Sequence, residues 1–212
     1  MNAHSIELDE LELDALTELV NIGVSRAAAS LRKMVNRQVT LSVPSVEIIT
    51  RKSAAALIGQ RESELLIAVQ QQFEGPFSGR ALLIFPESNG LSLVRAIVGE
   101  DMGEADLIDM KDEALAETGN VILNGCLGSM ANMLQHTLNM SLPDVRRGDS
   151  DLLFEVPGSA REDSFVLFLY INFSVHERDI RGYIAMIMDL PSLEKLKLLI
   201  SNFIDRVMTE ID

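Results

Sequence analysis

The sequence predicts an α+β fold built from two copies of one unit with pseudo-twofold symmetry, in which a largely antiparallel sheet packs against long helices. Three observations support this prediction. The chain has 212 residues, of which 47% are hydrophobic, and this is enough to bury a sizeable core. Helical and β-prone patterns follow one another in the same order in both halves. One spaced set of residues also occurs twice, and such internal repetition is typical of duplicated architecture.

The repeated set has four members in each half, with the same spacing between them. Each member of the second set lies 99 residues after its counterpart, as the differences 113 − 14 and 143 − 44 show. A Glu, an Asn and a Pro at such spacing should occur by chance at about one start position in ten thousand, so two copies in register indicate a duplication. The members are Asp14, Glu18, Asn21 and Pro44 in the first half and Glu113, Glu117, Asn120 and Pro143 in the second.

Each half is expected to begin with a long helix followed by a short strand. Apolar residues recur with a helical period from about Glu10 to Val35 and again from about Asp112 to Leu138. A strand should then end near the proline of each motif, because proline cannot donate a hydrogen bond to a strand ladder. The strands predicted on this basis are Val39 to Val43 and Met140 to Leu142.

Two further strands and a closing helix complete each predicted half. The strand candidates are rich in Val, Ile, Phe and Tyr, and a proline before each closing helix stops the strand and begins the helix. The last helix is amphipathic, so its apolar face belongs either to the core or to a partner surface. The strands are Leu65 to Phe73, Gly79 to Phe85, Phe165 to Val175 and Gly182 to Met188, and the helices are Asn89 to Val98 and Leu193 to Ile211.

An acidic segment from Gly99 to Asp112 connects the two repeats, which cover about residues 10–99 and 109–211. Its acids do not follow the alternating order of a calcium-binding loop, so we expect a surface connection without a metal. Neither half would bury a good core alone. We therefore expect a single domain over residues 1–212, with one core shared between the repeats.

The motif residues of each long helix should form a polar stripe opposite the apolar side, since successive residues turn by about 100°. The stripes are Asp14, Glu18, Asn21 and Ser25 on the first helix and Glu113, Glu117, Asn120 and Asn124 on the second. Glycines within a helix lower its stability, so they suggest that the helices or the sheet approach one another closely there. These glycines are Gly23, Gly119, Gly125 and Gly128.

Charge and cysteine content exclude several classes of protein. The formal net charge of −14 argues against non-specific nucleic-acid binding and favours a partner that presents basic groups. The single Cys126 has apolar neighbours, which indicates a buried thiol in a reducing compartment. The start of the chain, Met1 to Glu12, lacks the order of a secretion signal, and no apolar run reaches membrane-spanning length. We expect a cytoplasmic protein without a membrane partner.

The glutamate and the asparagine of each motif project together from neighbouring helical turns. A solvated face needs only polarity, whereas both residue types are kept in two helices that otherwise share few identities, which indicates a function. A neutral carboxamide can hold a water molecule beside an anionic phosphoryl group, and phosphoryl transfer depends mainly on orientation and electrostatics. The carboxylate would repel the phosphate, so it is better suited to pairing with a lysine of a partner.

At these residues the chain resembles the CheC, CheX and FliY family of phosphatases, which dephosphorylate the chemotaxis response regulator CheY (CheY-P) in two-component signalling. The resemblance extends from about Leu11 to Met208, and two copies of E-x2-N-x22-P in a chain of this length are similar to a CheC-like member. CheX-like chains are usually shorter with one copy, and FliY-like chains add a flagellar-switch domain for which no segment remains here. The family commonly has Asp or Ser at the position of Asp14, whereas the second copy has Glu113.

The resemblance implies a hydrolase that removes phosphate from the phosphoaspartate of a CheY-type receiver. Glu18 and Glu117 would then contact a lysine of the receiver, and Asn21 and Asn120 would orient the attacking water, while Pro44 and Pro143 would be structural. The receiver would supply Mg2+, so neither a metal site nor an intrinsic cofactor is expected in this chain. CheC-like proteins also bind the receptor deamidase CheD, which makes CheD an expected partner by resemblance alone.

A function of another class stays open from the sequence alone. A non-catalytic adaptor could bind a receiver domain or another flagellar or chemotaxis component through the same helix faces. A hydrolase with its own nucleophile is disfavoured, because Cys126 lies on the apolar side of its helix and no serine occupies a G-x-S-x-G turn. None of the histidines accompanies either motif; they are His4, His136 and His176.

Overall fold

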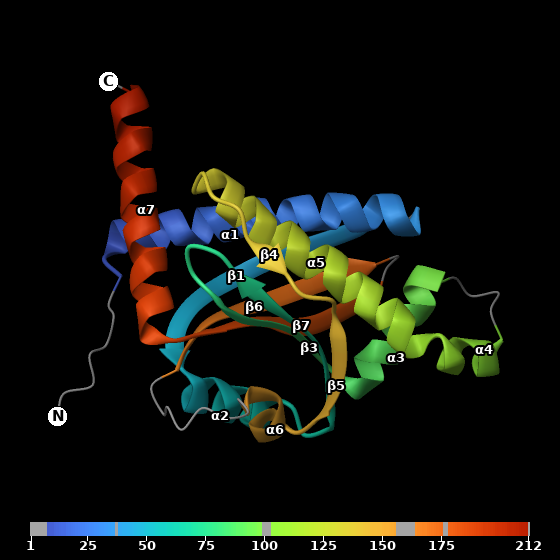
Figure 1. The fold of residues 1–212 in the computed structure, drawn as a ribbon. Helices are drawn as coiled ribbons and strands as arrows, with labels where there is room; N and C mark the ends of the chain where they lie inside the picture. Colours follow the sequence, from blue (N-terminus) through green and yellow to red (C-terminus); the bar gives the residue numbers. More distant parts are fainter. Residues whose placement is uncertain (1–7, 37, 99–102, 156–163, 176–177, 212) are drawn as a thin grey trace.

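One antiparallel sheet organises the parts of the chain that the computed structural model describes, namely residues 8–36, 38–98, 103–155, 164–175 and 178–211 (Figure 1). Its strands lie in the order β1-β6-β7-β3-β2-β4, and β5 also pairs with β2. Every pairing is antiparallel, which confirms the predicted α+β class. The strands are β1 (Val39–Thr50), β2 (Leu66–Glu74), β3 (Gly79–Pro86), β4 (Asn139–Met140), β5 (Asp144–Gly148), β6 (Phe165–Val175) and β7 (Arg178–Met188).

Helices cover both faces of the sheet (Figure 1). The long helices α1 (Glu10–Val35) and α5 (Lys111–Met133) pack against each other on one face, and α2 (Arg51–Arg61) and α6 (Ser150–Phe154) lie together on the opposite face. The short α4 (Glu104–Asp109) leads into α5. Two closing helices flank the long pair, because α3 (Glu87–Val98) packs on α5 and α7 (Leu190–Ile211) packs on α1.

Each repeat places two neighbouring strands in the sheet, and its remaining strand or strands pair with the other repeat. The first strand of the first repeat, β1, pairs with β6 of the second, while β4 and β5 of the second repeat pair with β2 of the first. The remaining strands β3 and β7 pair with each other in the middle. The order is therefore symmetric about the β3–β7 pair, and neither repeat forms its sheet from its own strands alone.

The sheet separates two apolar layers. The larger layer lies between the sheet and the long helices and includes Leu16, Val20, Ile122, Val69 and Leu169. The smaller layer lies under α2 and α6, where Ile58 and Phe154 pack on buried residues from the opposite face of the same strands. Alternate residues of each central strand thus enter opposite layers, as the period of two in a strand requires.

The long helices touch through small residues. A Cβ atom on Gly23 would lie 2.8 Å from the backbone oxygen of Cys126, and one on Gly125 would lie 2.8 Å from the Cβ of Ala27. A Cβ atom on Gly119 would lie closer still to the side chain of Val69 of β2. These contacts confirm the close approach predicted at three glycines. The prediction was wrong for Gly128, because nothing lies within 4 Å of the position of its Cβ.

Several element boundaries differ from the predictions. Helix α5 ends at Met133 rather than Leu138, since Gln135 adopts a positive φ of 61° that a helix cannot continue through. Strand β1 runs on to Thr50, because its pairing shifts register between Ser42 and Ser45 and Pro44 lies in that irregularity, outside the regular ladder. Thus Pro44 does not end the strand.

Four short elements were absent from the sequence-based map: α2, α4, α6 and β5. Helix α2 buries only Ala54, Ala55 and Ile58, so its apolar period is weak, and α6 is a single short turn of helix. Part of the acidic connection is helical, since α4 begins directly after Gly103. Among the described residues, no helix is both long and apolar enough to cross a membrane.

Helix α7 belongs to the core in its first half, where Leu193, Leu196 and Ile200 are buried, while Phe203 and Ile204 beyond them are only half-buried. Figure 1 shows its last turns extending past α1. A nearly buried carboxylate joins the two helices, because Glu12 of α1, with a side chain 8% exposed, pairs with Lys197 at 3.2 Å and accepts a hydrogen bond from Ser201 Oγ at 2.9 Å.

Glu12 also forms a capping box with Asp9, whose backbone N–H donates to Glu12 Oε2 at 3.0 Å. Burial by itself would raise the pKa of Glu12. The hydrogen bonds from Asp9 and Ser201, together with the charge of Lys197, outweigh burial and hold the pKa below its ordinary value. The ionised carboxylate therefore stabilises the start of α1 and its contact with α7.

Replacing this carboxylate by Glu12→Gln should lower the free energy of unfolding by about 1 kcal/mol at pH 7. Because folding lowers the pKa, the stabilisation is complete above the ordinary value of about 4.3 and disappears as the pH falls through the folded value. Urea denaturation at neutral and at acid pH measures the difference between native chain and variant. A difference independent of pH would contradict the role of the charge, and Glu10→Gln, at an exposed position, serves as the control.

The helix contact predicts opposite effects for two glycine substitutions. Gly23→Ala should destabilise the fold by about 1–3 kcal/mol, because the added methyl group meets the backbone of Cys126 and the helices must separate. Gly128→Ala should stabilise the fold by up to about 1 kcal/mol, since its position is open and alanine favours a helix. Thermal unfolding of both variants checks this, and equal effects would contradict the tight α1–α5 contact.

Candidate functional site

The first motif lies along the outward side of α1. Asp14 and Glu18 are exposed, and Asn21 is half-buried, with Ser25 exposed one turn further on. The opposite side of the same helix enters the core through Leu16, Leu19 and Val20. Packing of that apolar side orients the stripe outward, so both Glu18 and Asn21 are accessible to a macromolecule.

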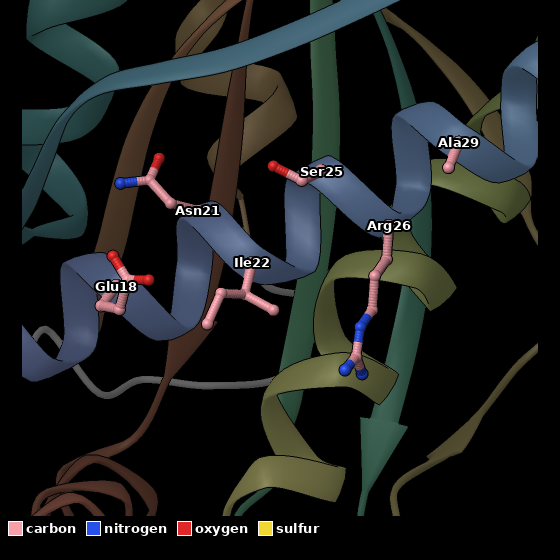
Figure 2. Close-up of a pocket in the computed structure, with 6 residues that line it drawn as sticks. All are labelled: Glu18, Asn21, Ile22, Ser25, Arg26 and Ala29. Atoms are coloured by element: carbon pink, nitrogen blue, oxygen red, sulfur yellow. The ribbon is translucent and has the colours of Figure 1, made fainter.

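An open hollow runs along this stripe (Figure 2). Asn21 and Ser25 point to one side of the α1 axis, while Ile22 and Arg26 point to the other. Arg26 brings a positive charge beside the motif that the sequence reasoning did not single out. The hollow is lined by Glu18, Asn21, Ile22, Ser25, Arg26 and Ala29.

The second motif has a similar position on α5 but different neighbours. Glu113 and Glu117 are exposed, while Asn120 and Asn124 are half-buried. The Oδ1 atom of Asn120 accepts hydrogen bonds from Nε2 of Gln71 at 3.0 Å and from Nδ2 of Asn124. The carboxamide of the second motif is therefore held by two donors.

Gln71 was missed by the sequence reasoning, although the sequence contains a signal for it. It lies on β2 between Val69 and Phe73, on the side of the strand that faces the larger core layer. An amide among apolar residues at an inward position of a buried strand is unusual and indicates a specific hydrogen-bonding role. At 1% exposure, Gln71 reaches Asn120 from beneath α5.

The prolines of the two motifs lie at irregularities of the sheet edges. Pro44 lies in the register shift of β1, and Pro143 lies between β4 and β5. Neither position is part of the helical stripes. The structure therefore brings together the glutamate and asparagine within each motif, and it places Pro44 within β1 and Pro143 in the connection between β4 and β5.

Within the described parts of the chain, no three His, Cys, Asp or Glu side chains are arranged to hold a metal ion. Cys126 is a free and fully buried thiol. Burial raises its pKa to about 12, so the thiolate needed for nucleophilic attack is not formed near neutral pH. At the stripes, the amides can donate and accept hydrogen bonds, and the carboxylates can pair with cations.

Two family models match the sequence. The model described as "Chemotaxis phosphatase CheX" matches residues 67–167, and the model described as "CheC-like family" matches residues 11–48. Together they include one copy of the Glu–Asn pair each, with Glu117 and Asn120 in the first match and Glu18 and Asn21 in the second.

Similar curated proteins carry related names. The chain is 24% identical over 200 residues to the CheY-P phosphatase CheC of Bacillus subtilis (strain 168), covering 89% of this chain and 93% of that protein. It is 26% identical over 206 residues to the flagellar motor switch phosphatase FliY of the same organism, covering 96% of this chain and 52% of FliY. The chain thus spans about half the length of that FliY.

Solved structures share the fold at low sequence identity. The crystal structure of Thermotoga maritima FliY matches with a TM-score of 0.72 and 18% identity, over 94% of this chain and 100% of that one. The FliM middle domain from H. pylori matches with a TM-score of 0.58 and 10% identity, over 91% of this chain and 99% of that one. These likenesses confirm the architecture.

The burial of Cys126 predicts an inert thiol in the folded protein. At pH 8 a thiol-reactive aromatic disulfide should label the folded chain at least about 100-fold more slowly than the urea-unfolded chain, because the folded thiol is both inaccessible and protonated. Absorbance of the released thiolate measures the rate. Rapid labelling under native conditions would contradict the burial of this side chain.

Proposed function

We propose that this chain, a CheC-like member of the CheC, CheX and FliY family, is a phosphatase that hydrolyses the phosphoaspartate of a CheY-type receiver domain. One observation carries the proposal: both helices present an exposed glutamate and a half-buried asparagine at the same spacing on an outward stripe. The names of the relatives in Bacillus subtilis agree with this activity.

In the proposed reaction, the oxygen of a water molecule attacks the phosphorus of the acyl phosphate. The bond between phosphorus and the aspartate oxygen breaks, which leaves a free carboxylate on the receiver and releases inorganic phosphate that keeps the protons of the water. Asn21 or Asn120 orients the attacking water through its neutral carboxamide. The helices pack against the sheet, so each amide is held on a rigid element rather than on a loop.

The carboxylates have a different role in this proposal. Glu18 and Glu117 are exposed and pair with a lysine of the receiver, which brings the neighbouring amide to the phosphoryl group. The net charge of −14 opposes the approach of an anionic partner, so a local cation on the receiver is needed to overcome it. In the hollow along the first motif, Arg26 adds a positive charge that suits the phosphorylated surface.

Two parts of the proposal rest on the family resemblance. The receiver holds Mg2+ beside its phosphoaspartate, and the ion neutralises charge that develops on the phosphoryl oxygens. CheD is proposed as a second partner, on a surface that the two motifs do not define. The compartment proposed for all of these encounters is the cytoplasm.

An adaptor without catalysis is the second candidate. The observation in its favour is the fold shared with the FliM middle domain of H. pylori, since one fold supports more than one function. Such an adaptor would bind a receiver or a flagellar component through the same stripes and leave its phosphate in place. Measurement of dephosphorylation separates the two candidates.

Removing both asparagines should abolish the proposed activity. Asn21→Ala and Asn120→Ala should each lower the rate of phosphate loss from a phosphorylated CheY-type receiver, and the double variant should lose about 100-fold or more, because no group then orients the water. Binding of the receiver should be retained. Phosphate release during steady-state turnover measures the rate.

Asn202→Ala, on the exposed side of α7, provides a matched control that should leave the rate unchanged.

In contrast, Glu18→Ala combined with Glu117→Ala should mainly raise KM, because docking is weakened while the amides stay in place. An adaptor would accelerate dephosphorylation in no version of the chain, and activity in the double asparagine variant equal to that of the native chain would refute the assigned roles.

A further inference from the structure

The amide of Gln71 lies in a nearly dry environment and makes two hydrogen bonds through one atom. Its Nε2 donates to the backbone oxygen of Ser141 at 2.8 Å and to Oδ1 of Asn120 at 3.0 Å. The side chain is 1% exposed, and its Oε1 is buried without a hydrogen-bond partner among the described residues. Leaving a buried carbonyl oxygen without a hydrogen bond lowers the stability of the fold.

These contacts determine the orientation of three side-chain amides, each one fixed by the one before it. A backbone oxygen can only accept, so Gln71 must turn its nitrogen toward Ser141. The same nitrogen faces Asn120, which must therefore present its oxygen to Gln71. Asn124 donates to the same Oδ1 atom, so both lone pairs of the Asn120 oxygen are used. The NH2 group of Asn120 is then directed away from the buried donors.

The first motif lacks this arrangement. The position of Asn124 is taken by Ser25 on α1, as their separation of 99 residues (124 − 25) shows. On β6, which corresponds to β2, Ile171 lies between Leu169 and Phe173 on the inward side and is 2% exposed. No hydrogen bond of the Asn21 side chain is found in the described parts of the chain, so this amide is free to turn.

The comparison of β2 with β6 shows that packing does not require an amide at this place. An isoleucine fills the corresponding inward position of β6, and burying an apolar side chain there is favourable. Gln71 is instead retained with an unpaired oxygen. An orienting role for its NH2 group accounts for a polar side chain that the core alone would not favour.

We propose that Gln71 is a positioning residue of the second site: it holds the carboxamide of Asn120 so that its NH2 group faces the incoming receiver and donates to the attacking water. This proposal rests on the proposed phosphatase function. The two sites then differ in mechanism, since Asn120 is oriented before the receiver binds and Asn21 becomes oriented only upon binding. Gln71 should raise turnover at the second site and have no effect at the first.

The test places Gln71→Met in two backgrounds, each with one working site. Methionine keeps the length of the side chain and removes the donor. With Asn21→Ala, where only the second site works, Gln71→Met should lower kcat about tenfold and change KM less than about twofold, because orientation rather than docking is lost. With Asn120→Ala, where only the first site works, the same substitution should change neither constant by more than about twofold.

Gln72→Met is the matched control, since Gln72 is the next residue of β2 and its side chain is exposed. It should leave kcat unchanged in both backgrounds. An equal fall of kcat with Gln71→Met in both backgrounds would mean a general loss of packing and would overturn the proposal. So would an unchanged kcat in the Asn21→Ala background.

A second measurement does not depend on phosphatase activity. In the native chain, 15N relaxation should give the side-chain amide of Asn120 a higher order parameter than that of Asn21, and Gln71→Met should lower it. Equal order parameters for the two native amides would overturn the proposal even if the chain is a phosphatase. If the native chain has no phosphatase activity, the proposed function fails, and the relaxation data still decide whether Gln71 holds Asn120.

Discussion

The close contact between α1 and α5 is the constraint on which the rest of the structure depends. Backbone approaches backbone at Gly23 and Cys126, so the axes of the two helices have little freedom to rotate or separate. Each helix must then bury one side in the layer above the sheet and expose the other. The accessible positions of Glu18 and Glu117 are consequences of this packing, not independent features.

The contact between α1 and α5 depends on both repeats, because strands of one repeat pair with strands of the other. Since β1 pairs with β6 and β5 pairs with β2, the strands beneath the two motif helices come from both repeats. Duplication therefore supplied two similar stripes, but it placed them over strands that could diverge. The inward position of β2 holds Gln71 and the corresponding position of β6 holds Ile171, and the asparagines of the two motifs have different surroundings.

Regular patterns were read correctly where long segments bury one face. The span of α1 was predicted in full, and the strands corresponding to β2, β3 and β6 were predicted within one residue at each end. Weakly amphipathic pieces were missed, as α2 illustrates by burying only alanines and Ile58. The rule that proline ends a strand failed at Pro44, because a register shift allows the chain to pass the proline and resume pairing.

The sequence by itself determined the duplication, the helical period and the two outward stripes, because these depend on spacing along the chain. Only the tertiary structure decided that the paired amides are not equivalent. The partners of Asn120 include Gln71, which lies 49 positions away in the chain, and a contact across that separation exists only after β2 has packed beneath α5. Local spacing carries no information about which strand a helix will cover, and that choice determines which amide is held.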